Sequence, residues 1–232
     1  MPNRRGCARH RLGGAARRWL ARVCQVRQAA SAASPSLLIA TTNAGKFREF
    51  CQLLADVPLH LTSLVELGNP PAVSEEGETY AANALHKALV IAGWSGAAVL
   101  ADDSGLEVDA LGGAPGVRSA RFAGDQQDSH ANLAKLLQLL KDTPPARRTA
   151  HFRCVVAVAR ADGRTLTAEG SCAGIIVEAP RGTEGFGYDP VFFYPPLGLT
   201  FAEMPAAQKN QVSHRARACR KLRESLIEFL QS

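Results

Sequence analysis

Residues 151–177 constrain the fold of this chain more than any other segment, because they read as one long antiparallel hairpin. Two strand-like runs, residues 151–160 and 165–177, flank residues 161–164, which contain Asp162-Gly163. An Asp-Gly pair between two such runs is a strong hairpin signal. In the second run, polar residues alternate with apolar or small ones, which is typical of a strand with one dry and one solvated face.

Shorter apolar runs and helix-periodic segments surround this hairpin. Residues 37–40 and 98–101 are apolar runs of the length that buried strands adopt. Apolar residues recur at helical spacing in residues 47–54, 78–93, 128–140 and 213–230. The third of these helices should begin at Asp128, a good N-cap. Helices mixed with an antiparallel strand pair predict an α/β protein with a mixed sheet and flanking helices, not a regular doubly wound fold.

The charge of the chain divides it into a basic extension and a nearly neutral domain. The formal net charge is +6, but residues 1–35 hold 8 arginines and no acidic residue. Subtracting these from the 27 basic residues leaves 19 against 21 acidic residues in positions 36–232. We therefore expect one domain over residues 36–232, behind an Arg-rich extension over residues 1–35.

The extension itself allows three interpretations. It is either a disordered tail or a start-site artefact, an organellar transit peptide, or a nucleic-acid-binding arm. The first is favoured because the chain is generally rich in Arg and Ala and contains only two methionines, Met1 and Met204. The longest apolar stretch is far shorter than the roughly 18 residues of a membrane-spanning helix, so no membrane association is expected.

The 6 cysteines are scattered along the chain, with no CxxC pair and no neighbouring histidine cluster. This spacing argues against a disulfide framework and against a zinc site. Scattered thiols fit a reducing compartment, so we expect a cytoplasmic protein.

Two polar segments follow the predicted strands directly. Residues 41–46 read Thr-Thr-Asn-Ala-Gly-Lys at a strand-to-helix turn, where backbone N–H groups and one lysine suit a polyphosphate. The segment is not a Walker P-loop, because it lacks the first glycine of that motif. Asp102 and Asp103 come after the second run, and adjacent side chains there should point to opposite sides. One carboxylate could then face a cleft, hold Mg²⁺ and accept a proton from water.

Two further segments complete the candidate chemistry. Residues 74–78 form a second acidic cluster before a helix, where capping explains the acids as well as metal binding does. Residues 185–190 read GFGYDP, and Lys209 and Ser213-His214-Arg215 follow. Aromatic rings stack on bases, while Lys, His and Arg donate to carbonyl or phosphate oxygens. Together the four segments suit a nucleoside triphosphate with Mg²⁺.

These same segments resemble the inosine triphosphate pyrophosphatase family, which in bacteria comprises the dITP/XTP pyrophosphatases. The resemblance covers residues 37–231 and includes ATTNAGK at 40–46, NALHKA at 83–88, ADDSGLEVDALGGAPGVRSARFAG at 101–124, GFGYDP and SHR. It implies an elongated α/β fold of the ITPase-like or Maf-like type, with two lobes around a nucleotide cleft. It also implies a homodimer that hydrolyses ITP, dITP and XTP to the monophosphate and pyrophosphate, and so removes deaminated purines from the nucleotide pool.

The resemblance also implies roles for individual residues. Asp103 would accept the proton and bind Mg²⁺, with Glu75 as the second metal carboxylate. The residues that would contact the nucleotide are Thr41, Thr42, Asn43, Ala44, Gly45, Lys46, Ser104, Phe186, Gly187, Tyr188, Asp189, Lys209, His214 and Arg215.

The chain departs from the usual family residues at Thr42, Ala82 and Arg118, where glycine, glutamate and tyrosine are common. Because Ala82 removes a carboxylate, Glu76 is a further candidate ligand beside Glu75 and Asp103. Two other functions stay open from the sequence. One is a pyrophosphatase for modified pyrimidine triphosphates, and the other is a non-enzymatic nucleotide- or RNA-binding protein that uses the Arg-rich extension.

Overall fold

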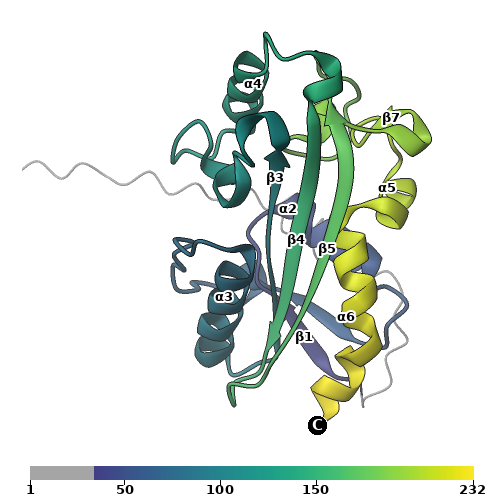
Figure 1. Cartoon of the computed structure of the whole chain (residues 1–232). Coiled ribbons are helices and arrows are strands. Elements are labelled where there is room, and N and C mark those ends of the chain that lie inside the picture. The colour runs from purple at the N-terminus through teal and green to yellow at the C-terminus, as the bar shows by residue number, and fades with distance from the viewer. Residues whose placement is uncertain (1–33) are drawn as a thin grey trace, which may run out of the picture.

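A computed structural model of the chain describes residues 34–232, which form one seven-stranded sheet with helices on both faces (Figure 1). The strand order is β2-β1-β3-β4-β5-β6-β7. The strands are β1 (Ser36–Ile39), β2 (His60–Ser63), β3 (Val99–Val108), β4 (Thr149–Ala159), β5 (Thr165–Ile176), β6 (Phe192–Tyr194) and β7 (Leu199–Thr200). β1 runs parallel to β2 and β3, and every later pairing is antiparallel, so the predicted mixed sheet is confirmed.

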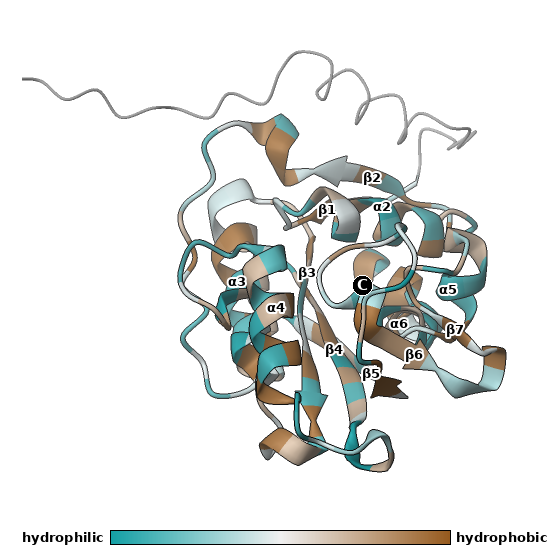
Figure 2. Cartoon of the chain, turned by 90° about the horizontal axis from the view of Figure 1, so that it is seen from above, coloured by the Kyte–Doolittle hydropathy of each residue, from teal (hydrophilic) through white to brown (hydrophobic). Residues whose placement is uncertain are grey.

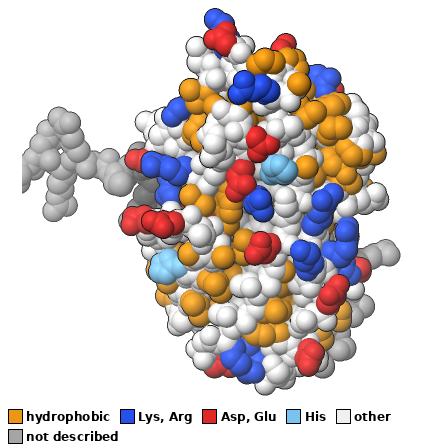
Figure 3. Space-filling view, in the orientation of Figure 1, with side chains coloured by type: hydrophobic (Ala, Val, Ile, Leu, Met, Phe, Trp, Pro, Cys, Tyr) orange, Lys and Arg blue, Asp and Glu red, His pale blue; other side chains and the backbone are white. Residues whose placement is uncertain are grey.

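The long hairpin predicted from the sequence is the centre of this sheet. β4 and β5 pair along their whole length, from Thr149 opposite Ile175 to Ala159 opposite Thr165. Asp162 accepts a hydrogen bond from the backbone N–H of Arg164, and Gly163 takes a positive φ of 87° in the turn. Thr165, Thr167 and Glu169 of β5 are exposed and Ser171 is half-buried. Figure 3 shows acidic and basic side chains interspersed over one face of the molecule.

Four of the five α-helices in the described residues correspond to segments predicted from the sequence, and α5 was not predicted. They are α2 (Ala44–Leu53), α3 (Tyr80–Ser95), α4 (Ser129–Leu139), α5 (Ala206–Val212) and α6 (His214–Gln231). Side chains of Asn43, Thr79, Asp128 and Ser213 cap the N-termini of α2, α3, α4 and α6. Gly96 ends α3 in the left-handed conformation that glycine adopts most readily.

Seen from above, α3 covers one face of the sheet, and α2 and α6 cover the other (Figure 2). Alternate residues of β1 therefore enter different cores. Leu37 and Ile39 pack with α2 and α6, whereas Leu38 packs with α3.

A third core lies at the far end of the β4–β5 hairpin. It joins α4 to the aromatic side chains Phe152, Phe192 and Phe201 and makes the second of two lobes. The expected elongated, two-lobed α/β fold is confirmed.

One prediction about β3 was wrong. The sequence indicated a strand at residues 98–101 with the acidic pair after it, but β3 continues to Val108 and contains both Asp102 and Asp103. The strand tolerates them because β4 pairs with it throughout, with Asp103 opposite Val155, and because each carboxylate has a partner on its own face of the sheet. The expectation that the two side chains point to opposite sides is confirmed.

The predicted extension, residues 1–35, lies outside the described residues except for Ser34 and Pro35. The carbonyl of Pro35 accepts a hydrogen bond from the backbone N–H of His60, at 2.9 Å, so ordered pairing starts one residue before β1. No helix in the described part is long and apolar enough to cross a membrane. The four described cysteines, Cys51, Cys154, Cys172 and Cys219, are free thiols.

Candidate active site

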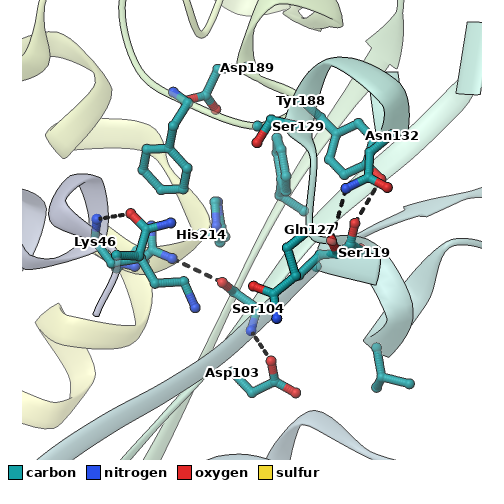
Figure 4. A pocket seen from close by; sticks show the side chains of 18 of the residues that line it. Lys46, Asp103, Ser104, Ser119, Gln127, Ser129, Asn132, Tyr188, Asp189 and His214 are labelled. Carbon is teal, nitrogen blue, oxygen red and sulfur yellow. Dashed lines mark hydrogen bonds between the residues drawn. The ribbon is translucent and has the colours of Figure 1, made fainter. Parts of the chain in front are cut away.

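A cavity of about 160 Å³ opens between the two lobes, and most of the predicted site residues line it (Figure 4). From the lobe that contains α2 and α3 come Asn43, Lys46, Glu75, Asp103 and Ser104. From the other lobe come Ser119, Arg121, Gln127, Ser129 and Asn132. Residues 186–189 with Phe152, Lys209, His214 and Arg215 complete the wall.

The strand-to-helix turn at residues 41–46 is held largely by its own side chains. The Asn43 side-chain oxygen accepts hydrogen bonds from the backbone N–H groups of Gly45, at 2.8 Å, and Lys46, at 3.0 Å. Thr41 accepts one from the N–H of Asn43. Only Asn43 and Lys46 of this turn line the cavity. Two of the N–H groups expected to hold phosphate are thus already satisfied by the N-cap.

Gly45 has a different use in this turn. A Cβ atom at this position would overlap the ring of Phe186, which comes from the GFGYDP loop. The glycine therefore allows an aromatic ring to lie directly on the start of α2. Gly45 also lines a second cavity, behind Phe186.

The cationic side chains expected to bind phosphate are joined to carboxylates in a single chain of contacts. Lys46 pairs with Asp102 at 3.0 Å, and Arg215 pairs with Asp102 at 3.0 Å and also with Glu49. Lys209 pairs with Glu49 at 2.8 Å and with Asp189. Three cations therefore alternate with three carboxylates, so their charges cancel.

Burial makes this pairing strong. Burial by itself would raise the pKa of Asp102, but the nearby charges of Lys46, Arg215 and Lys87 outweigh it and hold that pKa well below the usual range. Burial would also lower the pKa of Arg215, but Asp102 and Glu49 raise it above its usual value. Asp102 and Arg215 both keep their charges inside the fold, because each has an opposite charge within reach.

Asp103 lies on the opposite face of β3 from Asp102 and has neutral hydrogen-bond partners. Asn83 donates to it at 2.9 Å, and the backbone N–H of Ser104 donates to its other oxygen at 2.9 Å. Burial raises the pKa of Asp103, and the hydrogen bond from Asn83 offsets this only in part. A carboxyl group with a raised pKa that lines a cavity is suited to accept a proton during catalysis.

Asn83 also connects Asp103 to the acidic segment. Its side-chain oxygen accepts a hydrogen bond from the backbone N–H of Gly77, at 2.8 Å. A Cβ on Gly77 would overlap that same oxygen. The segment that carries Glu75 therefore packs directly against the start of α3.

Glu75 lines the cavity with Asp103, whereas Glu76 is exposed and does not. The carboxylate of Glu75 pairs with Lys87, whose ammonium also donates to the carbonyl of Asp102, at 3.0 Å. Within residues 34–232 no group of three or more His, Cys, Asp or Glu side chains is arranged to hold a metal ion. Two carboxylates at one cavity do fit Mg²⁺, which is commonly held by one or two carboxylates together with substrate phosphates.

Aromatic rings form the other end of the cavity. The ring of His214 stacks on Phe152 with centroids 4.6 Å apart, and the hydroxyl of Tyr188 donates to the carbonyl of Ser119 at 2.8 Å. Burial lowers the pKa of His214 well below its usual value, and the charges of Arg215 and Lys209 lower it further, so the imidazole is neutral. Its Nδ1 and the Nε of Arg215 are buried without a hydrogen-bond partner in the described residues. Buried polar atoms of this kind are available to a ligand.

The structure brings most of the predicted residues together. Of the predicted nucleotide contacts, Thr41, Thr42, Ala44 and Gly45 do not line the cavity between the lobes, and the remaining ones do.

Sequence reasoning missed several groups that complete the site, namely Glu49, Asn83, Asp102 as an ion-pair partner, Phe152 and Arg121. Asn83 and Arg121 lie in the segments 83–88 and 101–124 that resemble the family, so the resemblance could have pointed to both residues. Nothing local marks Glu49, which contacts residues about 160 positions away.

A family model described as the Ham1 family matches residues 37–225. The dITP/XTP pyrophosphatase of Desulforamulus reducens is 51% identical over 190 residues, which cover 82% of this chain and 94% of that protein. The dITP/XTP pyrophosphatase of Geobacter sulfurreducens is 48% identical over 190 residues, 82% of this chain and 96% of that protein.

Solved structures of Ham1 proteins are also similar to this chain. The Staphylococcus aureus Ham1 protein superposes with a TM-score of 0.73 at 39% identity, covering 82% of this chain and 97% of that one. A HAM1 protein from Coxiella burnetii superposes with a TM-score of 0.75 at 36% identity, covering 84% of this chain and 99% of that one.

Proposed function

Because the chain belongs to the Ham1 family, we propose that it hydrolyses the non-standard purine nucleoside triphosphates ITP, dITP and XTP to the monophosphate and pyrophosphate. One observation carries the proposal. A single cavity joins two carboxylates, Asp103 and Glu75, to a wall of aromatic rings and buried, unpartnered nitrogens. The two carboxylates suit the binding of a metal ion and the hydrolysis of a phosphate bond. The aromatic rings and the unpartnered nitrogens suit the binding of a purine base.

The chemistry follows from the position of Asp103. A water molecule attacks the α-phosphorus, the bond from that phosphorus to the α–β bridging oxygen breaks, and Asp103 accepts the proton of the water. Asn83 and the N–H of Ser104 hold the carboxylate in place for this step. We propose Mg²⁺ as the cofactor, with Asp103 and Glu75 as the residues that would hold it; when bound, it would neutralise phosphate charge.

The base end favours a 6-oxopurine. Hypoxanthine and xanthine have an acceptor oxygen at position 6, where adenine has an amino donor. The Nε–H of Arg215 is a donor that lacks a partner in the described residues, so an adenine amino group would leave it unpaired. An unpaired buried polar group can discriminate between substrates by roughly 10⁴-fold.

A panel of nucleotides tests this function. We expect pyrophosphate release from ITP, dITP and XTP in the presence of Mg²⁺, and far slower release from ATP, GTP, dUTP and methylated pyrimidine triphosphates. Faster turnover of the pyrimidine nucleotides would favour the alternative enzyme. A protein that hydrolyses none of them would contradict the proposal.

The role of Asp103 is tested with a matched pair of variants. Asp103→Ala should lower kcat by roughly 10²–10⁴-fold, the range for loss of a positioned general base. Asp109→Ala is the control, because Asp109 directly follows the same strand and is 53% exposed outside the cavity. Wild-type turnover by Asp103→Ala would remove Asp103 from the mechanism.

We further propose that the protein is a homodimer, as the family resemblance implies. The support in this structure is the outward side of α3, where Leu89 is 40% and Trp94 is 43% exposed. Light scattering of the purified protein should give twice the monomer mass, and Trp94→Glu should lower it if this face is the interface.

The cytoplasm is the proposed compartment. The support is chemical: four described cysteines are free thiols, and scattered free thiols are typical of reducing compartments. Cell fractionation with an antibody against the chain tests it.

A further inference from the structure

The charge balance of the cavity singles out one cation. Four Lys or Arg side chains line it: Lys46, Lys209, Arg215 and Arg121. The first three belong to the neutral chain of alternating charges with Glu49, Asp102 and Asp189. Among the described residues, no carboxylate lies within 4.0 Å of Arg121, so its charge is the one that is not cancelled by a direct partner.

Arg121 is held firmly at the phosphate end of the cavity. Its Nη2 donates to the backbone carbonyl of Glu75 at 2.6 Å, and so anchors the guanidinium at the backbone of a residue that is assigned to the metal. The short helix that carries it, Gly116–Arg121, is fixed by Ser119. The Ser119 hydroxyl accepts from the N–H of Leu106 at 2.8 Å and donates to the carbonyl of Gly116 at 2.6 Å.

This contact also spans the cleft. Arg121 belongs to the lobe of α4, whereas Glu75 precedes α3 in the other lobe. A guanidinium has five N–H donors in a planar fork, and the contact with Glu75 leaves others for a ligand. Arginine is well suited to bidentate recognition of phosphate.

We propose that Arg121 binds the polyphosphate of the substrate directly and supplies the uncompensated positive charge that the neutral lysine and arginine chain lacks. The inference rests on the proposed function, since it assigns a residue to the same substrate. It revises the expectation that Lys46, Lys209 and Arg215 provide the charge for the triphosphate. The charges of these three are each paired with a carboxylate, whereas the charge of Arg121 has no such partner among the described residues.

The probe is inorganic tripolyphosphate, with binding measured by calorimetry in EDTA. EDTA removes divalent ions. Any effect of Arg121 on tripolyphosphate affinity is then a direct contact and does not act through a metal ion held by Glu75. Arg121→Gln should weaken tripolyphosphate binding by about 10- to 100-fold, as expected for the loss of charge-assisted hydrogen bonds. Arg121→Lys should recover part of this affinity, because it keeps the charge and loses the fork.

Arg118→Gln is the matched control. Arg118 lies on the same short helix, is exposed and does not line the cavity. Its replacement removes the same charge from the molecule and should leave tripolyphosphate affinity and the KM for ITP unchanged. A loss in Arg118→Gln equal to that in Arg121→Gln would overturn the proposal, because the effect would then come from overall charge.

Kinetics with ITP and Mg²⁺ give the second measurement. Arg121→Gln should raise the KM for ITP more than it raises the inhibition constant of IMP, which lacks two of the phosphates. Equal affinity of the wild type and Arg121→Gln for tripolyphosphate would overturn the inference, as would a wild-type protein that does not bind this probe. A wild type that binds tripolyphosphate through Arg121 but hydrolyses no nucleotide would refute the proposed function and leave the phosphate site standing.

Discussion

Arg215 is among the largest fully buried side chains of the described residues, and it keeps its charge there because two carboxylates face it. Removing one partner of a buried ion pair typically costs 3–5 kcal/mol, roughly, because the other charge is left without compensation. The same contacts fix the direction of the guanidinium. At the scale of single residues, the ion pairs with Glu49 and Asp102 therefore fix the position of Arg215 at the base end of the cavity.

His214, the neighbour of Arg215, makes the stability of the fold depend on pH. Its pKa in the folded state lies well below the usual 6.5, so the unfolded chain binds a proton that the folded chain does not. The stability contributed by neutral His214 is thus fully present above pH 6.5 and is lost as the pH falls below it. Arg215, Lys209 and Lys46 face the imidazole and oppose its protonation, and Asp102 favours it.

The variant His214→Gln tests this prediction. Between pH 7.5 and pH 5.5 the wild type should lose about 1 kcal/mol more free energy of unfolding than the variant, the value that proton linkage gives for one such group. Urea unfolding of both proteins at several pH values measures it. Parallel pH profiles would contradict the prediction, because they would mean that the pKa of His214 is the same in the folded and the unfolded protein.

At the scale of elements, one glycine determines how closely the last helix approaches the sheet. A Cβ on Gly170 of β5 would overlap the carbonyl oxygen of His214 and the backbone nitrogen of Ala218, both in α6. Because α6 begins with His214 and Arg215, the distance between helix and strand also sets the position of the base end of the cavity.

Gly170→Ala should therefore displace α6, destabilise the protein by about 1–3 kcal/mol, as overpacking does, and lower kcat/KM for ITP. Gly93→Ala is the matched control, because a Cβ at Gly93 of α3 meets no atom within 4 Å. That change should be neutral or stabilise by about 0.5–1 kcal/mol, since alanine favours a helix more than glycine does. Thermal unfolding and ITP kinetics compare the two. Similar stability of both variants would show that α6 does not rest on Gly170.

Some of the helices and strands could be predicted from local sequence patterns, and others could not. The hairpin, the N-caps and the apolar faces of the helices could be predicted, because each depends on residues close together in the chain. The length of β3 could not, because Asp102 and Asp103 are poor strand residues in isolation. Their place in the strand depends on β4, on Asn83 and on cations from α2 and α6.

At the scale of the whole molecule, the nucleotide cavity lies within residues 34–232, and its lining comes from both lobes. We therefore predict that a chain without residues 1–33 keeps the kcat and KM for ITP within about twofold and the same melting temperature.

RNA binding by the full chain and by the truncated chain, measured at several salt concentrations, tests the role of the extension. Eight arginines without acidic residues would bind a polyanion in a salt-dependent way, and truncation should remove such binding from the full chain. A truncated protein that loses nucleotide hydrolysis would show instead that the extension belongs to the enzyme.

The sequence by itself determined the class of fold, the order of most elements and the segments that meet at the cavity, because hydrophobic period, turn residues and capping are local properties. Only the tertiary structure decided which charges remain available. Arg215 meets Glu49 across 166 positions of the chain, and Arg121 meets Glu75 across 46. Compensation of charge depends on distance in space, so a sequence that indicates Lys46, Lys209 and Arg215 for a phosphate site cannot show that all three are already paired with carboxylates.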